Sequence, residues 1–301
     1  MTNTQLIPLT HLAILDITGE DAQTFLQNQI PGDIRLVHRE SAQISGWCNA
    51  KGRLLTTFIL WQIDAGYRLV LARDLRDIIA KRLKMFVLRL KVQVTSSEDP
   101  VLGLLNPTDS LNGLNLPAAS WQVADDRGIT AVRLDPNRCL ITGSSEAIQS
   151  LISETPGGTL DAWLRVDVSE GLPIVTQATT EHYVPQMVNL DRLGGVSFKK
   201  GCYPGQEIVA RTHYLGKIKR HLYRVSATSS IAAGQEVRAA SLNGQSCGSL
   251  LTVSPAADGT HWLALAVLQR DAVEGPLSIE SHKGTVDLKV IDQVMPESQE
   301  R

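Results

Sequence analysis

The sequence has few cysteines, no long apolar run and no excess of positive charge, and each shortage argues against a class of protein. Its four cysteines among 301 residues include no CxxC pair. This pattern argues against a zinc or disulfide framework and predicts a reducing, cytoplasmic setting. A net charge of -2 argues against a surface that coats nucleic acid, so direct nucleic-acid binding is not expected. The longest apolar run near the C-terminus, WLALAVL, is far too short to span a bilayer.

Signals for secretion and for conventional catalysis are also missing. The N-terminus has neither a basic segment nor a small-residue cleavage site, so no secretory signal is expected. The seven histidines form no HExxH motif, and GGVSFKKG has the wrong spacing for a phosphate-binding loop. No metal site is therefore expected. Cys202 and His213 could form a thiol–imidazole pair, but their spacing does not fix that geometry, and a surface histidine is the simpler interpretation.

The first 170 residues instead show mixed strand and helix patterns. Residues alternate as in a strand in LAILDITG, and recur at helical spacing in EDAQTFLQNQI, which ends at Pro31–Gly32. Further strands are predicted in ISGWCNAKGRLLTTFILWQI, YRLVLA, KVQVTSS, VLGLLNP, WQVADD and ITAVRLD. Helices are predicted over SSEAIQSLIS and LDAWLRVDVSEG. The fold class is therefore α+β.

Residues 73–91, RDLRDIIAKRLKMFVLRLK, are predicted to form an amphipathic helix. One face would carry Leu75, Ile78, Ile79, Leu83 and Phe86. The other face would carry seven positive charges against Asp74 and Asp77. A solvated surface is the simpler interpretation of this charge, and a docking patch for an anionic partner is the alternative.

The last 80 residues have a different pattern. Short β-rich runs separated by Gly, Asn and Asp turns extend from HLYRVSA to TVDLKVID. They predict a small antiparallel β-barrel. We therefore expect two regions, a ligand-binding α+β region over residues 1–220 and a barrel domain over residues 221–301.

A segment near the end of the first region contains a cysteine in an unusual setting. Residues 171–205 include eight glycines or prolines and no sustained period. So long an irregular connection is uncommon unless it binds a ligand or takes part in catalysis. Pro204 is expected to begin a short helix over GQEIVAR, which would place Cys202 near a helix N-terminus beside Lys199 and Lys200. Both features favour a reactive thiolate, whereas Cys48, Cys139 and Cys247 are expected to be buried apolar residues.

The octapeptide KGCYPGQE, residues 200–207, matches the K-G-C-Y-x-G-Q-E signature of the YgfZ-type folate-binding proteins at every fixed position. PQMVNLDRLGGVSFKK, GKIKR, ITGEDAQTFLQNQ and NAKGR resemble other segments of that family. The family is related to the folate-dependent aminomethyltransferase of glycine cleavage, the T-protein. The resemblance implies an aminomethyltransferase-like fold with two intertwined α+β subdomains, and tetrahydrofolate or another reduced folate as the ligand. It also implies a role in maintaining iron–sulfur enzymes, including those that methylthiolate tRNA.

The resemblance also assigns roles to individual residues. Cys202 would be the reactive thiol, and Lys200 and Tyr203 would be catalytic residues with it. The remaining fixed positions are Gly201, Gly205, Gln206 and Glu207. Trp163 matches a folate-contacting tryptophan, and Leu12 stands where the family has another. Core packing is the default for a lone tryptophan. An acidic partner would be steered by Lys199, Lys200, Lys217, Lys219 and Arg220.

Three roles for the thiol remain open: exchange with a one-carbon or sulfur-linked adduct, contact with an iron–sulfur cluster or its protein, and a purely structural motif. Thr56 and Thr57 stand where the aminomethyltransferases carry a pair of aspartates. A threonine hydroxyl is a poor general base at neutral pH. We therefore expect an accessory protein rather than a conventional enzyme, with an aminomethyltransferase-like activity as the alternative.

Overall fold

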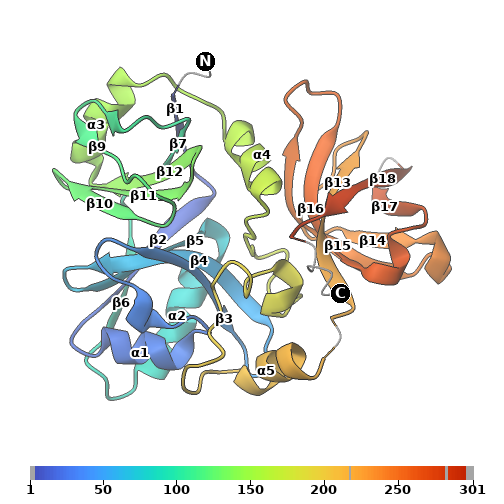
Figure 1. Cartoon of the computed structure of the whole chain (residues 1–301), viewed down its shortest axis with the longest axis horizontal. Helices are drawn as coiled ribbons and strands as arrows, with labels where there is room; N and C mark the ends of the chain where they lie inside the picture. Colours follow the sequence, from blue (N-terminus) through green and yellow to red (C-terminus); the bar gives the residue numbers. More distant parts are fainter. Residues whose placement is uncertain (1–3, 217, 282–283, 296–301) are drawn as a thin grey trace. The chain divides into compact units, whose positions relative to one another are not determined.

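The computed structural model describes residues 4–216, 218–281 and 284–295 (Figure 1). Lys217 lies outside the described residues. The chain forms two compact units, each built from separate stretches of sequence. The first contains Met1–Trp47, Thr56–Trp163 and Gly194–Pro204, and the second contains Cys48–Leu55, Leu164–Leu193 and Gly205–Arg301. The boundary between them falls within the KGCYPGQE signature.

The first unit contains two five-stranded antiparallel sheets. One has the order β1 (Gln5–Pro8), β7 (Val101–Leu105), β12 (Arg138–Gly143), β11 (Ile129–Asp135) and β10 (Val123–Asp126). Leu104, Cys139 and Ile141 from this sheet pack with Ile148 and Leu151 of helix α3 (Ser145–Glu154) in one apolar core. A short hairpin, β8 (Ser110–Leu111) and β9 (Leu114–Asn115), contributes further leucines to that core.

The second sheet has the order β3 (Ala42–Cys48), β4 (Leu54–Ile63), β5 (Gly66–Ala72), β2 (Leu12–Thr18) and β6 (Gln93–Ser97). Helices α1 (Ala22–Gln29) and α2 (Arg76–Val87) pack against it (Figure 1). A short 3-10 turn over Ile34–Leu36 follows α1, and another over Arg73–Leu75 leads into α2. Strands β2 and β4 are buried almost throughout, which is why their residues are so apolar.

The single run predicted from Ile44 to Ile63 is in fact two strands. A turn over Asn49–Arg53 separates β3 from β4. The Asn49 side-chain oxygen accepts hydrogen bonds from the backbone N–H groups of Lys51 (2.9 Å) and Arg53 (3.0 Å), and Gly52 has a φ of +69°. An Asn side chain that closes a turn in this way, followed by a left-handed glycine, ends the strand.

Helix α2 is shorter than predicted. It ends at Val87 because Leu88 adopts φ 49° and ψ -106°, outside the helical region. The predicted apolar face is also divided. Leu75, Ile79 and Leu83 are buried, whereas Ile78 and Phe86 are exposed.

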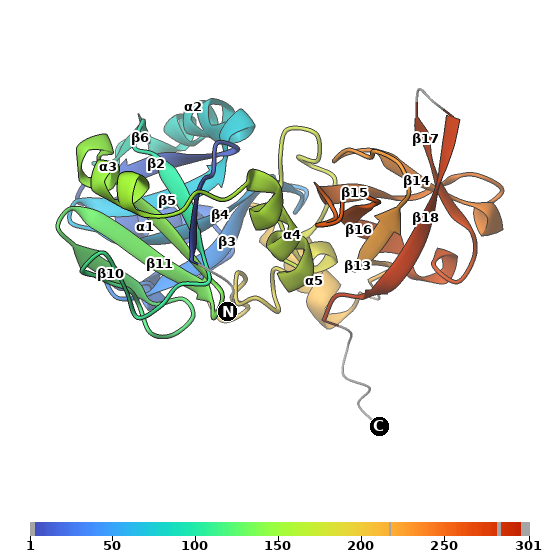
Figure 2. The same cartoon turned by 90° about the horizontal axis from the view of Figure 1, so that it is seen from above.

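The second unit contains the C-terminal barrel. Six antiparallel strands close in the order β13-β16-β15-β14-β17-β18 (Figure 2), which confirms the barrel predicted from the sequence. Their bounds are Arg220–Ala227, Trp262–Gln269, Ser246–Pro255, Glu236–Ala239, Leu277–Ser281 and Gly284–Gln293. Short 3-10 turns cover Ala240–Leu242 and Arg270–Ala272. Small side chains such as Ala264, Ala266 and Val225 fill the interior, as a narrow barrel requires.

The predicted irregular connection is present. Helix α4 (Leu160–Glu170) and helix α5 (Gln206–Tyr214) are joined by 35 residues whose only regular element is a 3-10 turn over Pro185–Val188. Among the described residues, no helix is both long and apolar enough to cross a bilayer.

Candidate functional site around Cys202

Cys202 differs from the other three cysteines in its exposure. It is exposed on the loop before α5, whereas Cys48, Cys139 and Cys247 are buried. Burial raises the pKa of Cys48 to about 12 and that of Cys139 to about 11. Because the thiolate is the nucleophilic form, these two cysteines are unreactive near neutral pH. Cys202 is therefore the candidate reactive thiol.

The loop that carries Cys202 is hydrogen-bonded to the first unit before it reaches the cysteine. The Ser45 hydroxyl of β3 donates to the carbonyl of Gly195 (2.9 Å). The Ser45 hydroxyl oxygen also accepts a hydrogen bond from the Gly32 N–H (3.2 Å). The Ser197 N–H donates to the Pro31 carbonyl (2.8 Å), and the Gln43 amide donates to the Gly194 carbonyl (2.6 Å). These bonds join the loop to β3 and to the turn after α1.

Lys200 fixes the loop at the signature itself. Its ammonium group donates to the carbonyls of Gln27 (2.6 Å), Ile30 (2.7 Å) and Gly32 (2.8 Å), at and just beyond the C-terminus of α1. An ammonium group has three N–H donors, so every donor is used, and the negative end of the helix dipole favours a cation there. Burial nevertheless lowers the pKa of Lys200 to about 8, with Asp33 opposing that effect. The observed contacts of Lys200 are those of a positioning residue.

Tyr203 is buried on the other side of the cysteine. The Lys200 ammonium lies 5.5 Å from the centre of the Tyr203 ring, within the range of a cation–π contact. Lys200 and Tyr203 are thus buried, while Gly201 and Cys202 between them are exposed. Two buried residues flanking an exposed pair fix the backbone and leave the thiol open to solvent.

The second half of the signature belongs to the second unit and packs on the NAKGR turn. Gly205 has a φ of +81°, and a Cβ placed there would lie 2.4 Å from the Asn49 carbonyl oxygen and 2.7 Å from the Gly52 Cα. Only glycine fits this position. Gly205 also serves as the N-cap of α5, so the helix begins at Gln206 and not at Pro204 as predicted. Gln206 is half-buried, and Glu207, in the first helical turn, is exposed.

The other predicted site residues are Trp163, Leu12, Lys199 and Arg220, and only Lys199 adjoins the KGCYPGQE loop in the sequence. Trp163 is only 1% exposed. A Cβ at Gly103 would lie 2.3 Å from its ring, and the Arg138 guanidinium lies 5.1 Å from the ring centre. Leu12 is buried at the start of β2. Lys199 is exposed, and Arg220 is half-buried at the start of β13.

Thr56 and Thr57 are buried on β4. The Thr56 hydroxyl donates to the Thr57 carbonyl (3.1 Å). Neither side chain carries a charge, so this position offers no carboxylate base. Within the part of the chain that the structure describes, there is no group of three or more His, Cys, Asp or Glu side chains that could hold a metal ion.

Sequence reasoning missed several residues that hold the site. Gln43 and Ser45 lie in an ordinary strand, and nothing in their sequence indicates that they bind a loop about 150 residues away. Gln186, buried in the long connection, donates to the carbonyl of Val209 on α5 (2.7 Å). Asn49 and Gly52 lie in the NAKGR motif, but their packing against Gly205 appears only in the fold.

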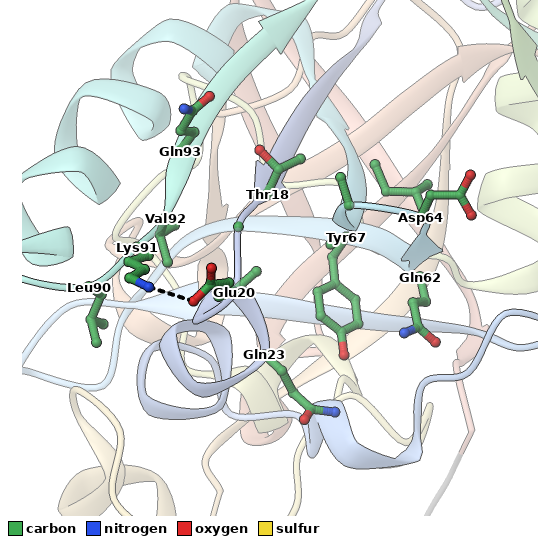
Figure 3. Close-up of a pocket in the computed structure, with 15 residues that line it drawn as sticks. Thr18, Glu20, Gln23, Gln62, Asp64, Tyr67, Leu90, Lys91, Val92 and Gln93 are labelled. Atoms are coloured by element: carbon green, nitrogen blue, oxygen red, sulfur yellow. Dashed lines mark hydrogen bonds and ion pairs between the residues drawn. The ribbon is translucent and has the colours of Figure 1, made fainter.

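A hollow of about 820 Å³ lies elsewhere on the first unit, at the ends of β2, β4, β5 and β6. Figure 3 shows the Tyr67 ring on one side of it and the ion pair between Lys91 and Glu20 on the other. None of the predicted site residues lines this hollow. It is therefore separate from the candidate site.

No protein-family model matches the chain. Curated relatives do match it and are described as tRNA-modifying protein YgfZ. One from Yersinia pseudotuberculosis serotype O:1b (strain IP 31758) is 31% identical over 280 residues, which cover 88% of this chain and 84% of the relative. Another from Vibrio atlanticus (strain LGP32) is 28% identical over 260 residues, which cover 83% and 80%.

A solved structure shares the fold. The glycine cleavage system aminomethyltransferase T from Bartonella henselae superposes with a TM-score of 0.78 at 16% sequence identity, covering 98% of this chain and 87% of that one. This likeness confirms the predicted aminomethyltransferase-like fold.

Proposed function

Because this chain belongs to the YgfZ family of tRNA-modifying proteins, we propose that it is a folate-binding accessory protein for enzymes that modify tRNA, with Cys202 as its reactive group. The observation that carries the proposal is the exposed thiol between two buried residues of one motif, Lys200 and Tyr203. A fixed backbone presents the thiol to a partner at little entropic cost. We place this function in the cytoplasm.

The clients proposed for it are iron–sulfur enzymes, including those that methylthiolate tRNA. Cys202 would either exchange with a one-carbon or sulfur-linked adduct or contact the cluster or its protein. Lys199, Lys219 and Arg220 would then steer an acidic client. The exposure of Cys202 and its lack of a hydrogen-bond partner among the described residues support both roles over a purely structural one.

Tetrahydrofolate is the proposed ligand, and two observations bear on whether the residues fit it. Trp163 supplies a flat indole, although its ring already packs against Gly103. Leu12 would offer apolar contact without stacking.

An aminomethyltransferase-like enzyme is the alternative, favoured by the shared fold. Thr56 and Thr57 argue against it, because a general base must accept a proton at neutral pH. The accessory role needs no such base.

Calorimetric titration with tetrahydrofolate, paired with an aminomethyl-transfer assay, tests the proposal. We expect wild type and Cys202→Ser to bind the folate with equal affinity and neither to turn over aminomethyl groups. Loss of folate affinity in Cys202→Ser would assign the cysteine a structural role. If neither protein bound tetrahydrofolate, the proposal that this chain binds folate would be wrong. Turnover of aminomethyl groups would establish the aminomethyltransferase alternative.

A further inference from the structure

Four apolar side chains are exposed along helix α2 and just beyond its end. Ile78 is 41% exposed, Met85 64%, Phe86 44% and Leu88 87%. Exposed apolar residues scattered singly are ordinary, but a contiguous group often marks an interaction surface. Together with Lys81, Arg82, Lys84 and Arg89, these residues are called the α2 patch.

The residues of the α2 patch are not the residues that pack the helix into the core. Ile79, Ala80 and Leu83 already fill the inner side of the helix, which packs against β6 and β2. Ile78 and Met85 are seven residues apart and therefore lie on one line of the outer surface, two turns from each other. Ile78 and Met85 thus lie on the outer surface of the helix, with the exposed Lys81 and Arg82 on the turn between them.

The backbone conformation of Leu88 and a ring contact of Phe86 fix the end of the patch. Leu88 adopts φ 49° and ψ -106°, a conformation that is strained for a residue other than glycine. Phe86 meets Trp47 of β3 edge-on, with ring centres 5.8 Å apart. A strained, exposed leucine beside a fixed phenylalanine suggests that this end of α2 has a role beyond folding.

The charge around Met85, Phe86 and Leu88 has one sign. Lys81, Arg82, Lys84 and Arg89 are all exposed. Asp77, the nearest acid on the helix, pairs with Arg76 (3.0 Å). No ion pair within the described residues joins Lys81, Lys84 or Arg89 to an acid. The patch therefore complements an acidic partner.

We propose that the α2 patch docks an acidic amphipathic segment of another protein. Apolar side chains of that segment would cover Met85, Phe86 and Leu88, and its carboxylates would meet the surrounding cations. A second copy of this chain would bring like charges together. RNA would leave the aliphatic side chains uncovered, and a flat anionic membrane would also face Asp74 and Asp77 at the other end of the helix. This proposal does not depend on folate or on Cys202.

A photo-crosslinking residue at Met85 of the full chain, expressed in cells, tests the proposal directly. The matched control carries the same residue at Gln149, which is exposed on α3 of the same unit. We expect a protein crosslink specific to position 85, and mass spectrometry should place it in a segment with acids and apolar residues at helical spacing. Crosslinks to RNA, to lipid or to a second copy of this chain, or a yield no higher than at Gln149, would overturn the proposal.

A charge swap then tests the docking chemistry. A synthetic peptide of the crosslinked segment should bind the Lys81→Glu/Lys84→Glu variant at least tenfold more weakly than wild type. Binding should recover when two acids of the peptide are changed to lysine. The melting temperature and Cys202 alkylation should be unchanged in this variant, which separates lost docking from lost folding. Equal affinity for both proteins, or failure of the swapped peptide to recover binding, would overturn the proposal.

Discussion

Cys202 and the three other cysteines lie in environments that predict different reactivity toward a thiol reagent. Cys202 is exposed, whereas the others are buried in sheets or in the barrel. We expect iodoacetamide at pH 7.5 to label the native protein once, at Cys202, and not at all after Cys202→Ser. Intact-mass measurement checks this, with unfolding in urea as the control that should expose all four thiols. Labelling of Cys48, Cys139 or Cys247 in the native protein would contradict the assignment.

The three hydrogen bonds of Lys200 should stabilise the loop that carries Cys202. Lys200→Met keeps most of the volume and removes the donors, leaving the carbonyls of Gln27, Ile30 and Gly32 without them. Such a loss costs about 1–3 kcal/mol, so the Ser197 amide should exchange its hydrogen about 5- to 150-fold faster. Hydrogen-exchange mass spectrometry measures this. Unchanged exchange would show that the loop is held without Lys200.

Lys200 also predicts a change of stability with pH. Burial lowers its pKa from 10.5 to about 8 in the folded chain, so between these values the unfolded chain binds more protons at this position. The free energy of unfolding therefore rises with pH in that window, and it has no slope from Lys200 below it. From pH 7.5 to 9.5, wild type should gain about 1–2 kcal/mol relative to Lys200→Met. Urea titrations measure the difference, and a constant difference would contradict the pKa.

Two turns that meet through glycines position the second half of the signature. Gly205→Ala must accept both a left-handed φ and a Cβ placed 2.4 Å from the Asn49 carbonyl. Gly194→Ala is the matched control, because Gly194 has a φ of +80° but no other atom lies within 4 Å of where its Cβ would stand. The conformation alone costs about 1–2 kcal/mol, so Gly205→Ala should lower the free energy of unfolding by clearly more than Gly194→Ala. An equal decrease in the free energy of unfolding for the two variants would show that the close packing of Gly205 against Asn49 does not contribute to stability.

Elements with a strong local pattern were predictable from the sequence. The barrel strands alternate and end at turn residues, and the long connection lacks any period, and both predictions are confirmed. The break at Asn49 was not predicted, because apolar residues continue on both sides of a turn closed by one side chain. The end of α2 was not predicted either. Leu88 is a good helix former, and its conformation depends on the chain around it.

The site itself was only partly predictable. The signature identifies Cys202, but its partners come from residues that the sequence does not mark. Ser45 and Gln27 lie about 150 residues or more from the loop they hold. Which carbonyls receive the Lys200 ammonium depends on the packing of α1 against the sheet. A local pattern carries no information on such distant contacts.

At the scale of the whole molecule, the separation of residues 221–301 as a domain stays a prediction. Several hydrogen bonds link the barrel to residues 164–193. Among them are those from Arg224 to the Val168 carbonyl (3.1 Å), from Asn189 to the Val294 carbonyl (2.8 Å), and between Tyr183 and Ser249 (2.6 Å). At about 1 kcal/mol each, these three bonds alone should make a fragment starting at residue 221 less stable than one starting at residue 164 by about 3 kcal/mol, and the other bonds should add to that difference. Urea unfolding of both fragments measures this, and equal midpoints would show that the barrel needs no support.

The central claim is that Cys202 is the working group of an accessory protein for tRNA modification. Its most direct test is the level of methylthiolated tRNA in cells that lack this protein and are complemented with wild type or with Cys202→Ala. We predict a deficit that wild type restores and Cys202→Ala does not, with both proteins present at equal levels. Equal restoration by the two proteins, or no deficit in the deletion strain, would contradict the claim.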